Sequence, residues 1–561
     1  MFFINIDEIV KYCFWVVLVR GRIMLQKMSL KRILFLLLTT TILLSTTVSA
    51  SVGKELNNNS GSKYMEKAAS VKGDLDPLVD LKVTVAIKEL RALDNIDSFS
   101  NPDFYLKIYI DGVEHTSPIW LNKRYVTANW YVTQDVPDDK EFVNITIQLW
   151  DWNDGKDRLC DISRSYQDKP NSREVNLVYS LKSAHWTGGD YILNEPTLFD
   201  PSGYGRLNGC DDNSIYENDR DCEVIFDIHQ NDFDGDGIPY WTEVNVYGTD
   251  PTVNDKGRDD DHDGVPIEWE FKWGHHFSMV SYNPPKGVDR WDYNPFVWED
   301  HKHMDPDEDG LDNVEEYLTS EWGSDPFRKD IFLEVDQMAI GPNGEGAYVP
   351  DLSKELLRDA FSKHNIGMHI NEGWPGGGEI IPFDINTSNR ELQEFYFDYF
   401  LHGDPNNWKR GVMHYGLVDY HSDRYGGFVF RTTADGKHYL LDSFQVSTSH
   451  LENFPFKYPL LSCFIRKSFN HEYQRAIVYA SAMMHETGHT LGIFGWNVPG
   501  CDNPLAVFPH VYWLKFKSYR SCMNYNYCYN LVDYSDGSHG KNDFDDWSNI
   551  DLTLFQRESF W

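Results

Sequence analysis

The chain has 561 residues, with 87 Asp and Glu against 51 Lys and Arg, and a formal net charge of -36 at pH 7. This charge argues against a nucleic-acid partner, because phosphate groups are bound by basic surfaces. Aromatic residues make up 15% of the chain, more than a disordered sequence contains, so most of it should fold, into roughly three or four domains. The acids are either a solvated surface or calcium ligands, and their spacing decides between the two.

Residues 1–50 have the features of an export signal preceded by additional residues. Lys31 and Arg32 form a basic start, residues 33–44 are mostly apolar, and Val48-Ser49-Ala50 is a small-residue cleavage site. We therefore predict a secreted, extracellular protein, with cell-surface association or a membrane anchor as the alternatives. Residues 51–75 are polar and indicate a linker.

Residues 76–226 contain short runs in which apolar and polar residues alternate, such as 81–85 and 143–147. Alternation with a period of two, interrupted by turn residues, predicts an antiparallel β-sandwich. If this part of the protein is exported, Cys210 and Cys222 could form a local disulfide.

Two acidic loops of this sandwich are candidates for a shared calcium site, because loops distant in sequence can meet at one end of a sandwich. The candidate ligands are Asp97, Asp103, Asp151, Asn153 and Asp157. The stretches 101–105 and 149–153 resemble the calcium-binding loops of C2 domains. The resemblance implies calcium-dependent contact with a membrane or surface; the alternative is a sandwich with polar loops and no metal.

Residues 227–328 repeat one acidic template three times, with residues at loop positions 1, 3, 5, 6 and 12. The three sets are Asp232, Asp234, Asp236, Gly237 and Glu243; Asp259, Asp261, Asp263, Gly264 and Glu270; and Asp305, Asp307, Asp309, Gly310 and Glu316. Alternate acids converge on a hard cation, the glycine allows a sharp turn, and the last glutamate can bind through both oxygens. The segments resemble EF-hand loops, and the Gly-Thr-Asp-Pro at 248–251 and Gly-Ser-Asp-Pro at 323–326 resemble thrombospondin type 3 repeats. We predict a calcium-stabilised spacer.

Residues 329–561 alternate strand-like and helical segments. The runs 331–335 and 366–370 are strand-like, whereas 352–364 and 475–491 have helical spacing. This alternation predicts an α/β or α+β catalytic domain. The predicted fold class is therefore multidomain, with a β-sandwich, a calcium-binding spacer and an α/β domain.

The chemistry of this last domain is indicated by His485-Glu486-Thr487-Gly488-His489. On a helix, residues at i and i+4 share a face, so His485 and His489 can bind one zinc ion. Glu486 can take the proton of a water that the metal acidifies. Gly492 can end the helix.

A second segment, Ser521-Cys522-Met523-Asn524-Tyr525, follows downstream. Together with the helix and its glycine, it resembles the metzincin zinc endopeptidases. The resemblance implies that Met523 lies in a tight turn beneath the zinc, and that Tyr525 lies near the metal and stabilises the oxyanion. The alternative for Met523 is ordinary core packing, and the alternative for Tyr525 is a buried phenol with a local hydrogen-bond partner.

The third zinc ligand departs from the family pattern, because Gly495 occupies the position where a histidine or aspartate is usual. A later residue must then supply it, since catalytic zinc normally has three protein ligands. Asp502 is the first choice, with His510 and His539 as alternatives.

These features predict a secreted zinc-dependent endopeptidase that acts on protein or peptide substrates, with Zn²⁺ and Ca²⁺ as cofactors. The alternative is a non-catalytic, calcium-dependent surface or adhesion protein with a decayed protease domain. Glu486 favours the enzyme, because a decayed domain has no need of it.

Overall fold

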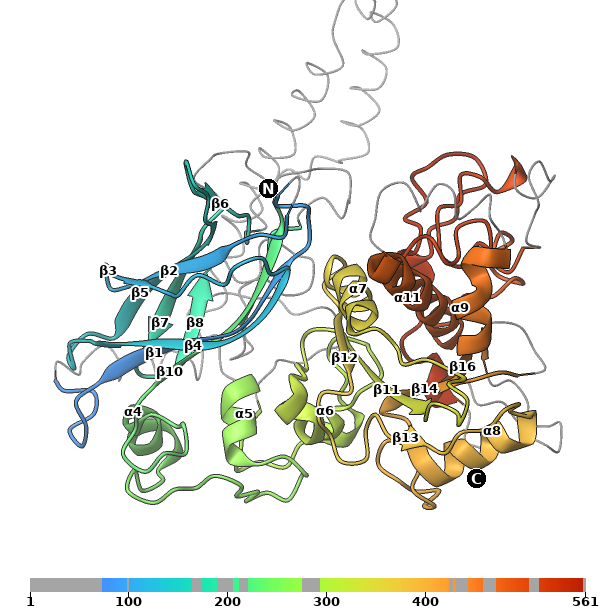
Figure 1. The fold of residues 1–561 in the computed structure, drawn as a ribbon. Helices are drawn as coiled ribbons and strands as arrows, with labels where there is room; N and C mark the ends of the chain where they lie inside the picture. Colours follow the sequence, from blue (N-terminus) through green and yellow to red (C-terminus); the bar gives the residue numbers. More distant parts are fainter. Residues whose placement is uncertain are drawn as a thin grey trace, which may run out of the picture. The chain divides into compact units, whose positions relative to one another are not determined.

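The computed structural model describes residues 73–97, 100–163, 173–188, 205–210, 220–274, 293–422, 427–429, 442–457, 471–503 and 514–557 (Figure 1). The predicted export signal, most of the predicted linker and His510 lie outside these residues. Among the helices of the described segments, none has the length and hydropathy that crossing a membrane requires.

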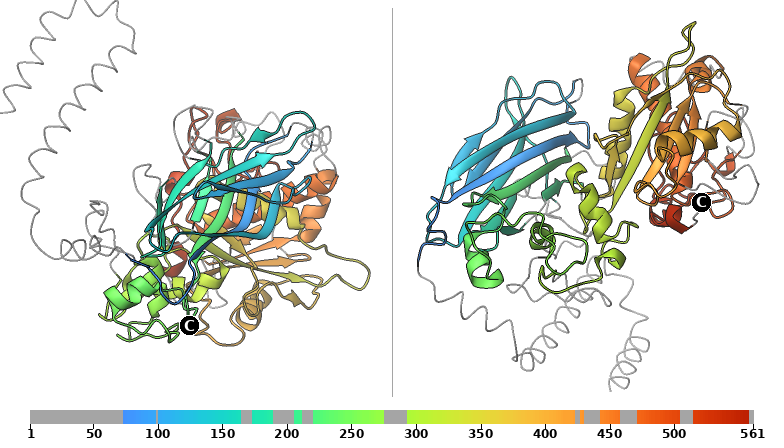
Figure 2. Two further views of the ribbon diagram at one scale, coloured as in Figure 1. Left: turned by 90° about the vertical axis from the view of Figure 1, so that its left-hand side faces the viewer. Right: turned by 90° about the horizontal axis from the view of Figure 1, so that it is seen from below.

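The N-terminal part is a sandwich of two antiparallel sheets, as predicted (Figure 2). One sheet has the order β4-β1-β10-β9, and its strands are β1 (Lys82–Ala92), β4 (Tyr125–Asp135), β9 (Gly205–Asn208) and β10 (Cys222–Gln230). The other has the order β3-β2-β5-β7-β8, with β6 paired to β5. Its strands are β2 (Phe104–Ile110), β3 (Val113–Thr116), β5 (Phe142–Asp151), β6 (Arg158–Leu159), β7 (Val175–Ser180) and β8 (His185–Gly188). Alternate residues of β5, including Val143 and Ile145, are buried in the core that both sheets share.

The prediction of a Cys210–Cys222 disulfide is wrong in this structure. Within the described segments no disulfide is formed, and the thiol of Cys222 lies in hydrogen-bond contact with Cys160 instead. Burial raises the pKa of the Cys222 thiol well above its usual value, so it behaves as a protonated core side chain.

The acidic region folds around small aromatic clusters instead of forming an extended linker. Its short helices are α4 (Tyr240–Thr242), η1 (Glu243–Tyr247), α5 (Ile267–Trp273), η2 (His301–His303), α6 (Asn313–Thr319) and η3 (Ser320–Trp322). One cluster contains Trp269, Trp273, Tyr293 and Phe327, all buried. The first turn of α6 is closed by a capping box, in which Asp312 and Glu315 bond each other's backbone N–H. A short helix thus stands at the C-terminal end of each acidic loop, and the one at the third loop is capped.

The C-terminal part is an α/β unit whose sheet has the order β12-β11-β14-β16-β15, with β13 also paired to β11. The strands are β11 (Asp330–Met338), β12 (Gly367–Ile370), β13 (Ile380–Ile381), β14 (Met413–Asp419), β15 (Gly427–Val429) and β16 (Ser443–Ser447). The helices are α7 (Asp351–Ser362), α8 (Asn389–Phe395), η4 (Tyr396–Phe400), α9 (Thr448–Lys457), α11 (His471–Thr490), η5 (Trp547–Asn549) and η6 (Leu554–Arg557). All pairs are parallel except β15 with β16, and the predicted alternation of strands and helices is confirmed.

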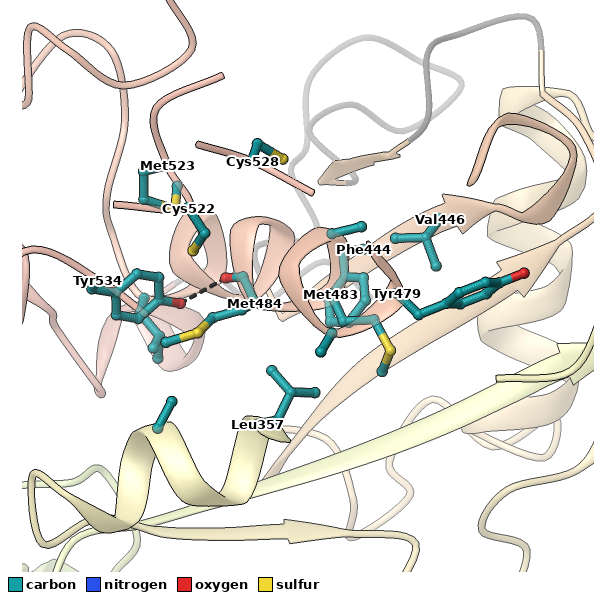
Figure 3. Packing of buried hydrophobic residues seen from close by; sticks show 14 of the residues in the cluster. Leu357, Phe444, Val446, Tyr479, Met483, Met484, Cys522, Met523, Cys528 and Tyr534 are labelled. Atoms are coloured by element: carbon teal, nitrogen blue, oxygen red, sulfur yellow. Dashed lines mark hydrogen bonds between the residues drawn. The ribbon is translucent and has the colours of Figure 1, made fainter. Parts of the chain in front are cut away.

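Both faces of this sheet are covered. Leu333 and Val335 of β11 belong to one core with α7 and α11, whereas Phe332 belongs to another with α8 and η4. Side chains of a strand alternate between faces, so one strand serves both cores. The long helix α11 is thereby fixed in this core through side chains that include Tyr479, Met483 and Met484 (Figure 3). Its buried C-terminal half carries the predicted zinc residues.

Candidate functional site

Helix α11 ends directly after the two predicted ligand histidines. Gly492 adopts a φ of +90°, a left-handed conformation that favours glycine. The N–H of Ile493 then donates to the carbonyl of Gly488 at 2.9 Å, which closes the helix end. The chain turns back at this point and leaves the last helical turn beside the loop that follows.

The two imidazoles are buried and each is held by a backbone carbonyl. Nδ1 of His485 lies 2.8 Å from the carbonyl oxygen of Cys522, and Nδ1 of His489 lies 2.6 Å from that of Ile493. A protonated Nδ1 donating to a carbonyl leaves the lone pair on Nε2, which is the arrangement of metal-binding histidines. The fold therefore presents two Nε2 lone pairs from one helix face.

Asp502 completes the group. Its Oδ1 lies 3.2 Å from Nε2 of His485 and 3.4 Å from Nε2 of His489. The residue has a φ of +52°, and its N–H donates to the carbonyl of Met523 at 3.1 Å. The loop after the helix thus brings to the histidines the residue that the sequence favoured as third ligand.

The spacing of these three atoms matches that of zinc ligands. Two ligands that each lie about 2.0–2.1 Å from a tetrahedral ion are about 3.3 Å apart. Oδ1 of Asp502 is buried and accepts no hydrogen bond, although both Nε2 atoms are near it. A carboxylate oxygen without a hydrogen bond, this close to two imidazole nitrogens, is better explained by an ion bound to all three atoms than by hydrogen bonds among them. The residues present therefore fit zinc. Zinc binding itself stays a prediction.

The electrostatics of the group depend on its burial. Burial alone would raise the pKa of the Asp502 carboxyl, but without a metal the two imidazoles in their protonated form hold that pKa well below its usual range. The ring of Tyr525 stacks on that of His485, with centroids 5.2 Å apart. Burial and the charges of Asp502 and Glu486 raise the pKa of Tyr525, so its hydroxyl stays protonated and able to donate. Glu486 is also buried, on the helix between the two histidines.

Met523 packs against the last turns of the helix, beside Gly488, and is fully buried (Figure 3). A Cβ on Gly488 would come within 2.4 Å of its sulfur and 3.0 Å of the hydroxyl of Tyr534. That hydroxyl donates to the carbonyl of Met484 at 2.7 Å, so it cannot easily move. Glycine between the two histidines is therefore what lets the methionine segment approach the helix.

We expect Gly488→Ala to lower the free energy of unfolding by about 1–3 kcal/mol, the usual cost of overpacking a core. The displaced methionine segment should also weaken metal binding, because Cys522 holds His485. Thermal melting and zinc content measure the two effects. Gly155→Ala is the control, since a Cβ there meets nothing within 4 Å; equal behaviour of the two variants would contradict the prediction.

The alternative third ligands are placed differently. His539 belongs to another group, with Nδ1 2.9 Å from Asp543 Oδ2 and 3.5 Å from Asp536 Oδ1. His510 lies outside the described residues. Of the described candidates, the structure brings only Asp502 to within 4.8 Å of both helix histidines.

The three acidic loops, loop 1 (232–243), loop 2 (259–270) and loop 3 (305–316), share one backbone conformation. The glycines at position 6 have φ values of +90° in Gly237, +106° in Gly264 and +99° in Gly310. Each glycine N–H donates to the carboxylate at position 1, at 3.1, 3.3 and 3.0 Å respectively. Such turns fold the position-1, -3 and -5 carboxylates toward one another.

The loops also share buried carboxylate oxygens. The position-12 residues Glu243, Glu270 and Glu316 are each 1% exposed. Oxygens without a hydrogen-bond partner include Asp234 Oδ2, both of Asp261, Asp307 Oδ2, Glu270 Oε1 and Glu316 Oε1. Buried carboxylates are costly unless a cation compensates them. Burial and neighbouring carboxylates raise the pKa of Glu243 to about 8 and that of Glu270 to about 10. This donor set fits Ca²⁺, whose binding stays a prediction.

The short motifs after loops 1 and 3 have the same role. The hydroxyl of Thr249 donates to Glu243 Oε1 at 3.1 Å, and that of Ser324 donates to Glu316 Oε2. Both hydroxyls follow a glycine with positive φ. Both hydroxyls orient the glutamate at position 12 of the preceding loop. The motifs at 248–251 and 323–326 are therefore alike in structure as well as in sequence.

The residues predicted to bind calcium on the sandwich are joined in one hydrogen-bond network around an arginine: Asp97, Asp103, Asp151, Asn153 and Asp157. Arg158 Nη2 donates to Asp151 Oδ2 at 2.7 Å, to Asn153 Oδ1 at 3.0 Å and to Asp97. The guanidinium thus lies among the acids that are predicted to bind calcium, and calcium binding by them stays a prediction. Arg158 follows Asp157 directly in the sequence, and this adjacency is the signal that could have predicted its place in the network.

No family model matches the chain, and no curated protein matches it. Among solved structures, a C2 domain matches 27% of this chain and 98% of its own, at 8% identity and a TM-score of 0.17. The first C2 domain of plant Extended Synaptotagmin 1 matches 28% and 94%, at 12% identity and a TM-score of 0.17. Human GIVD cytosolic phospholipase A2 matches 28% of this chain but 17% of its own, at 13% identity and a TM-score of 0.18. C2 domains are thus among its structural neighbours, but at these TM-scores the likeness carries no argument about function.

Proposed function

We propose that the chain is a zinc-dependent endopeptidase of metzincin type, exported from the cell and stabilised by calcium. The observation that carries this proposal is the set of three buried donor atoms, Nε2 of His485, Nε2 of His489 and Oδ1 of Asp502. Two of their separations, 3.2 and 3.4 Å, match those of zinc ligands. The non-catalytic alternative gives no reason for Glu486 to accompany them.

When bound, zinc supplies a Lewis acid for the substrate carbonyl and a lowered pKa for water. The remaining chemistry belongs to side chains of this protein. The carboxylate of Glu486 takes the proton of the attacking water and gives it to the leaving amine. The hydroxyl of Tyr525 donates to the oxygen of the tetrahedral intermediate, a stabilisation that develops only in the transition state. The carbonyls of Cys522 and Ile493 hold the imidazoles in one tautomer.

The third ligand gives the sharpest test of the site. We expect Asp502→Ala to lose the zinc of the helix site and casein cleavage together, because two histidines alone hold zinc weakly. His539→Ala is the matched control, since it removes a histidine of the separate Asp536–Asp543 group, and it should keep both properties. Elemental analysis and casein hydrolysis measure the outcome, with a zinc chelator abolishing activity in the parent chain. Loss of zinc in the His539 variant, but not in the Asp502 variant, would overturn the assignment. A zinc-loaded parent without proteolysis would favour the non-catalytic adhesion protein.

A further inference from the structure

Loop 2 differs from loops 1 and 3 in the residues that surround its position-12 glutamate, Glu270. After Glu270 the sequence has no Gly-Thr/Ser-Asp-Pro motif of the kind that follows loops 1 and 3. Two residues from beyond the loop approach instead. Nε2 of His301 lies 3.9 Å from Glu270 Oε1, 3.4 Å from Asp263 Oδ2 and 3.6 Å from Glu299 Oε2.

His301 has no exposed surface, and its Nε2 has no hydrogen-bond partner. The ring is enclosed by Trp269 and Tyr293, whose centroids lie 5.8 and 4.6 Å from its own. Oε1 of Glu270, on the other side of the gap, is also without a hydrogen-bond partner. A buried imidazole nitrogen and a buried carboxylate oxygen are therefore aimed at one another without bonding.

The other ring nitrogen is already held. Nδ1 of His301 lies 2.8 Å from the side-chain amide of Asn313, whose oxygen has no partner in its present orientation. A half-turn of this amide lets its oxygen accept from Nδ1–H, which satisfies the oxygen and leaves the lone pair on Nε2. Histidines that bind a metal usually donate a hydrogen bond through one ring nitrogen and bind the ion with the lone pair of the other.

We propose that Asp263, Glu270, Glu299 and His301 form a second transition-metal site, of the kind that binds Zn²⁺. One ligand atom from each of the four lies within 4.8 Å of all the others. The nitrogen–oxygen separations of 3.4–3.9 Å are near the roughly 3.3 Å between tetrahedral ligands. Imidazole with carboxylates favours zinc, whereas calcium takes oxygen ligands alone. Asp259, Asp261 and Asp263 form an all-oxygen group beside it, so Asp263 joins the two sites.

The test counts metals in the full chain, purified with both zinc and calcium present. We expect two zinc ions per chain in the parent. One should remain in His301→Gln, in Glu299→Gln and in a His485→Gln/His489→Gln double variant, and none when the double variant is combined with Glu299→Gln. His303→Gln is the matched control, because that exposed histidine pairs with Asp300, outside the proposed group, and the variant should keep two zinc ions. Casein cleavage should persist in His301→Gln.

Glu299→Gln keeps the proposal testable if the buried His301→Gln chain does not fold, since Glu299 is partly exposed. X-ray absorption on the double variant adds a second measurement, in which zinc bound by one imidazole and oxygen atoms is expected. A double variant without zinc, or a Glu299→Gln chain that loses calcium but no zinc, would overturn the proposal and leave His301 as an ion-pair partner only. If the proposed helix zinc site is wrong, the His485→Gln/His489→Gln chain will keep the zinc content of the parent. If the second site is wrong, the Glu299→Gln and His301→Gln chains will keep it.

Discussion

Glu486→Gln should keep its zinc and its stability while losing about 10²–10⁴-fold in kcat/KM for casein, the usual contribution of general-base catalysis. The amide has the shape of the carboxylate but cannot take a proton from water near neutral pH. Because Glu486 is not one of the three grouped donors, metal content should not change. The measurements are casein kinetics, elemental analysis and thermal melting on the same preparation.

Glu472→Gln provides the control for this substitution. Glu472 lies in the first turn of the same helix α11, is exposed, and should tolerate the change. A Glu486 variant with parental proteolysis would exclude its role as the base. A variant that loses zinc along with activity would instead assign Glu486 a structural role at the metal group.

The sequence predicted most of the helix site because local rules determine it. The spacing of His485 and His489 and the terminating Gly492 follow from helix geometry alone. Asp502 could be ranked only by its order in the chain, because a positive φ and a bond to the Met523 carbonyl bring it to the histidines. Such loop closures depend on tertiary packing, which periodicity does not encode.

Two other features could not be predicted from the same patterns. His301 and Glu299 lie some 30 residues beyond loop 2, and only folding around Trp269 and Tyr293 brings them to Glu270. On the sandwich, acid spacing predicted a calcium site but not that Arg158 bonds the same acids. The spacing of acidic residues predicts which carboxylates come together. It does not predict which positively charged group will lie beside them.

Removing calcium should destabilise the acidic spacer more than removing zinc destabilises the helix site. Each site occupied at 1,000 times its dissociation constant adds about 4 kcal/mol, and three calcium loops contribute against two zinc sites, one at the helix and one beside loop 2. Dialysis into calcium-free buffer with zinc, or zinc-free buffer with calcium, separates the two effects. Thermal melting should fall further in the first buffer, and equal shifts would contradict the prediction.

The calcium-free protein should also show an unusual pH dependence. The pKa of Glu243 is raised from 4.5 to about 8, and that of Glu270 from 4.5 to about 10, by burial and neighbouring carboxylates. Above pH 4.5 the folded chain then binds more protons than the unfolded chain, so stability falls as pH rises, by up to about 1.4 kcal/mol per pH unit and group.

We therefore expect the calcium-free chain to melt at a higher temperature at pH 5.5 than at pH 8. Calcium should remove this difference, because the bound ion replaces the protons that hold the carboxylates together. Glu243→Gln should reduce the slope, since an amide in that position does not titrate. Glu114→Gln is the control, because Glu114 is exposed and its pKa is lowered by hydrogen bonding to Tyr109. A calcium-free chain that becomes more stable from pH 5.5 to 8 would show that these carboxylates are charged in the folded state, and that the loops need no cation to form.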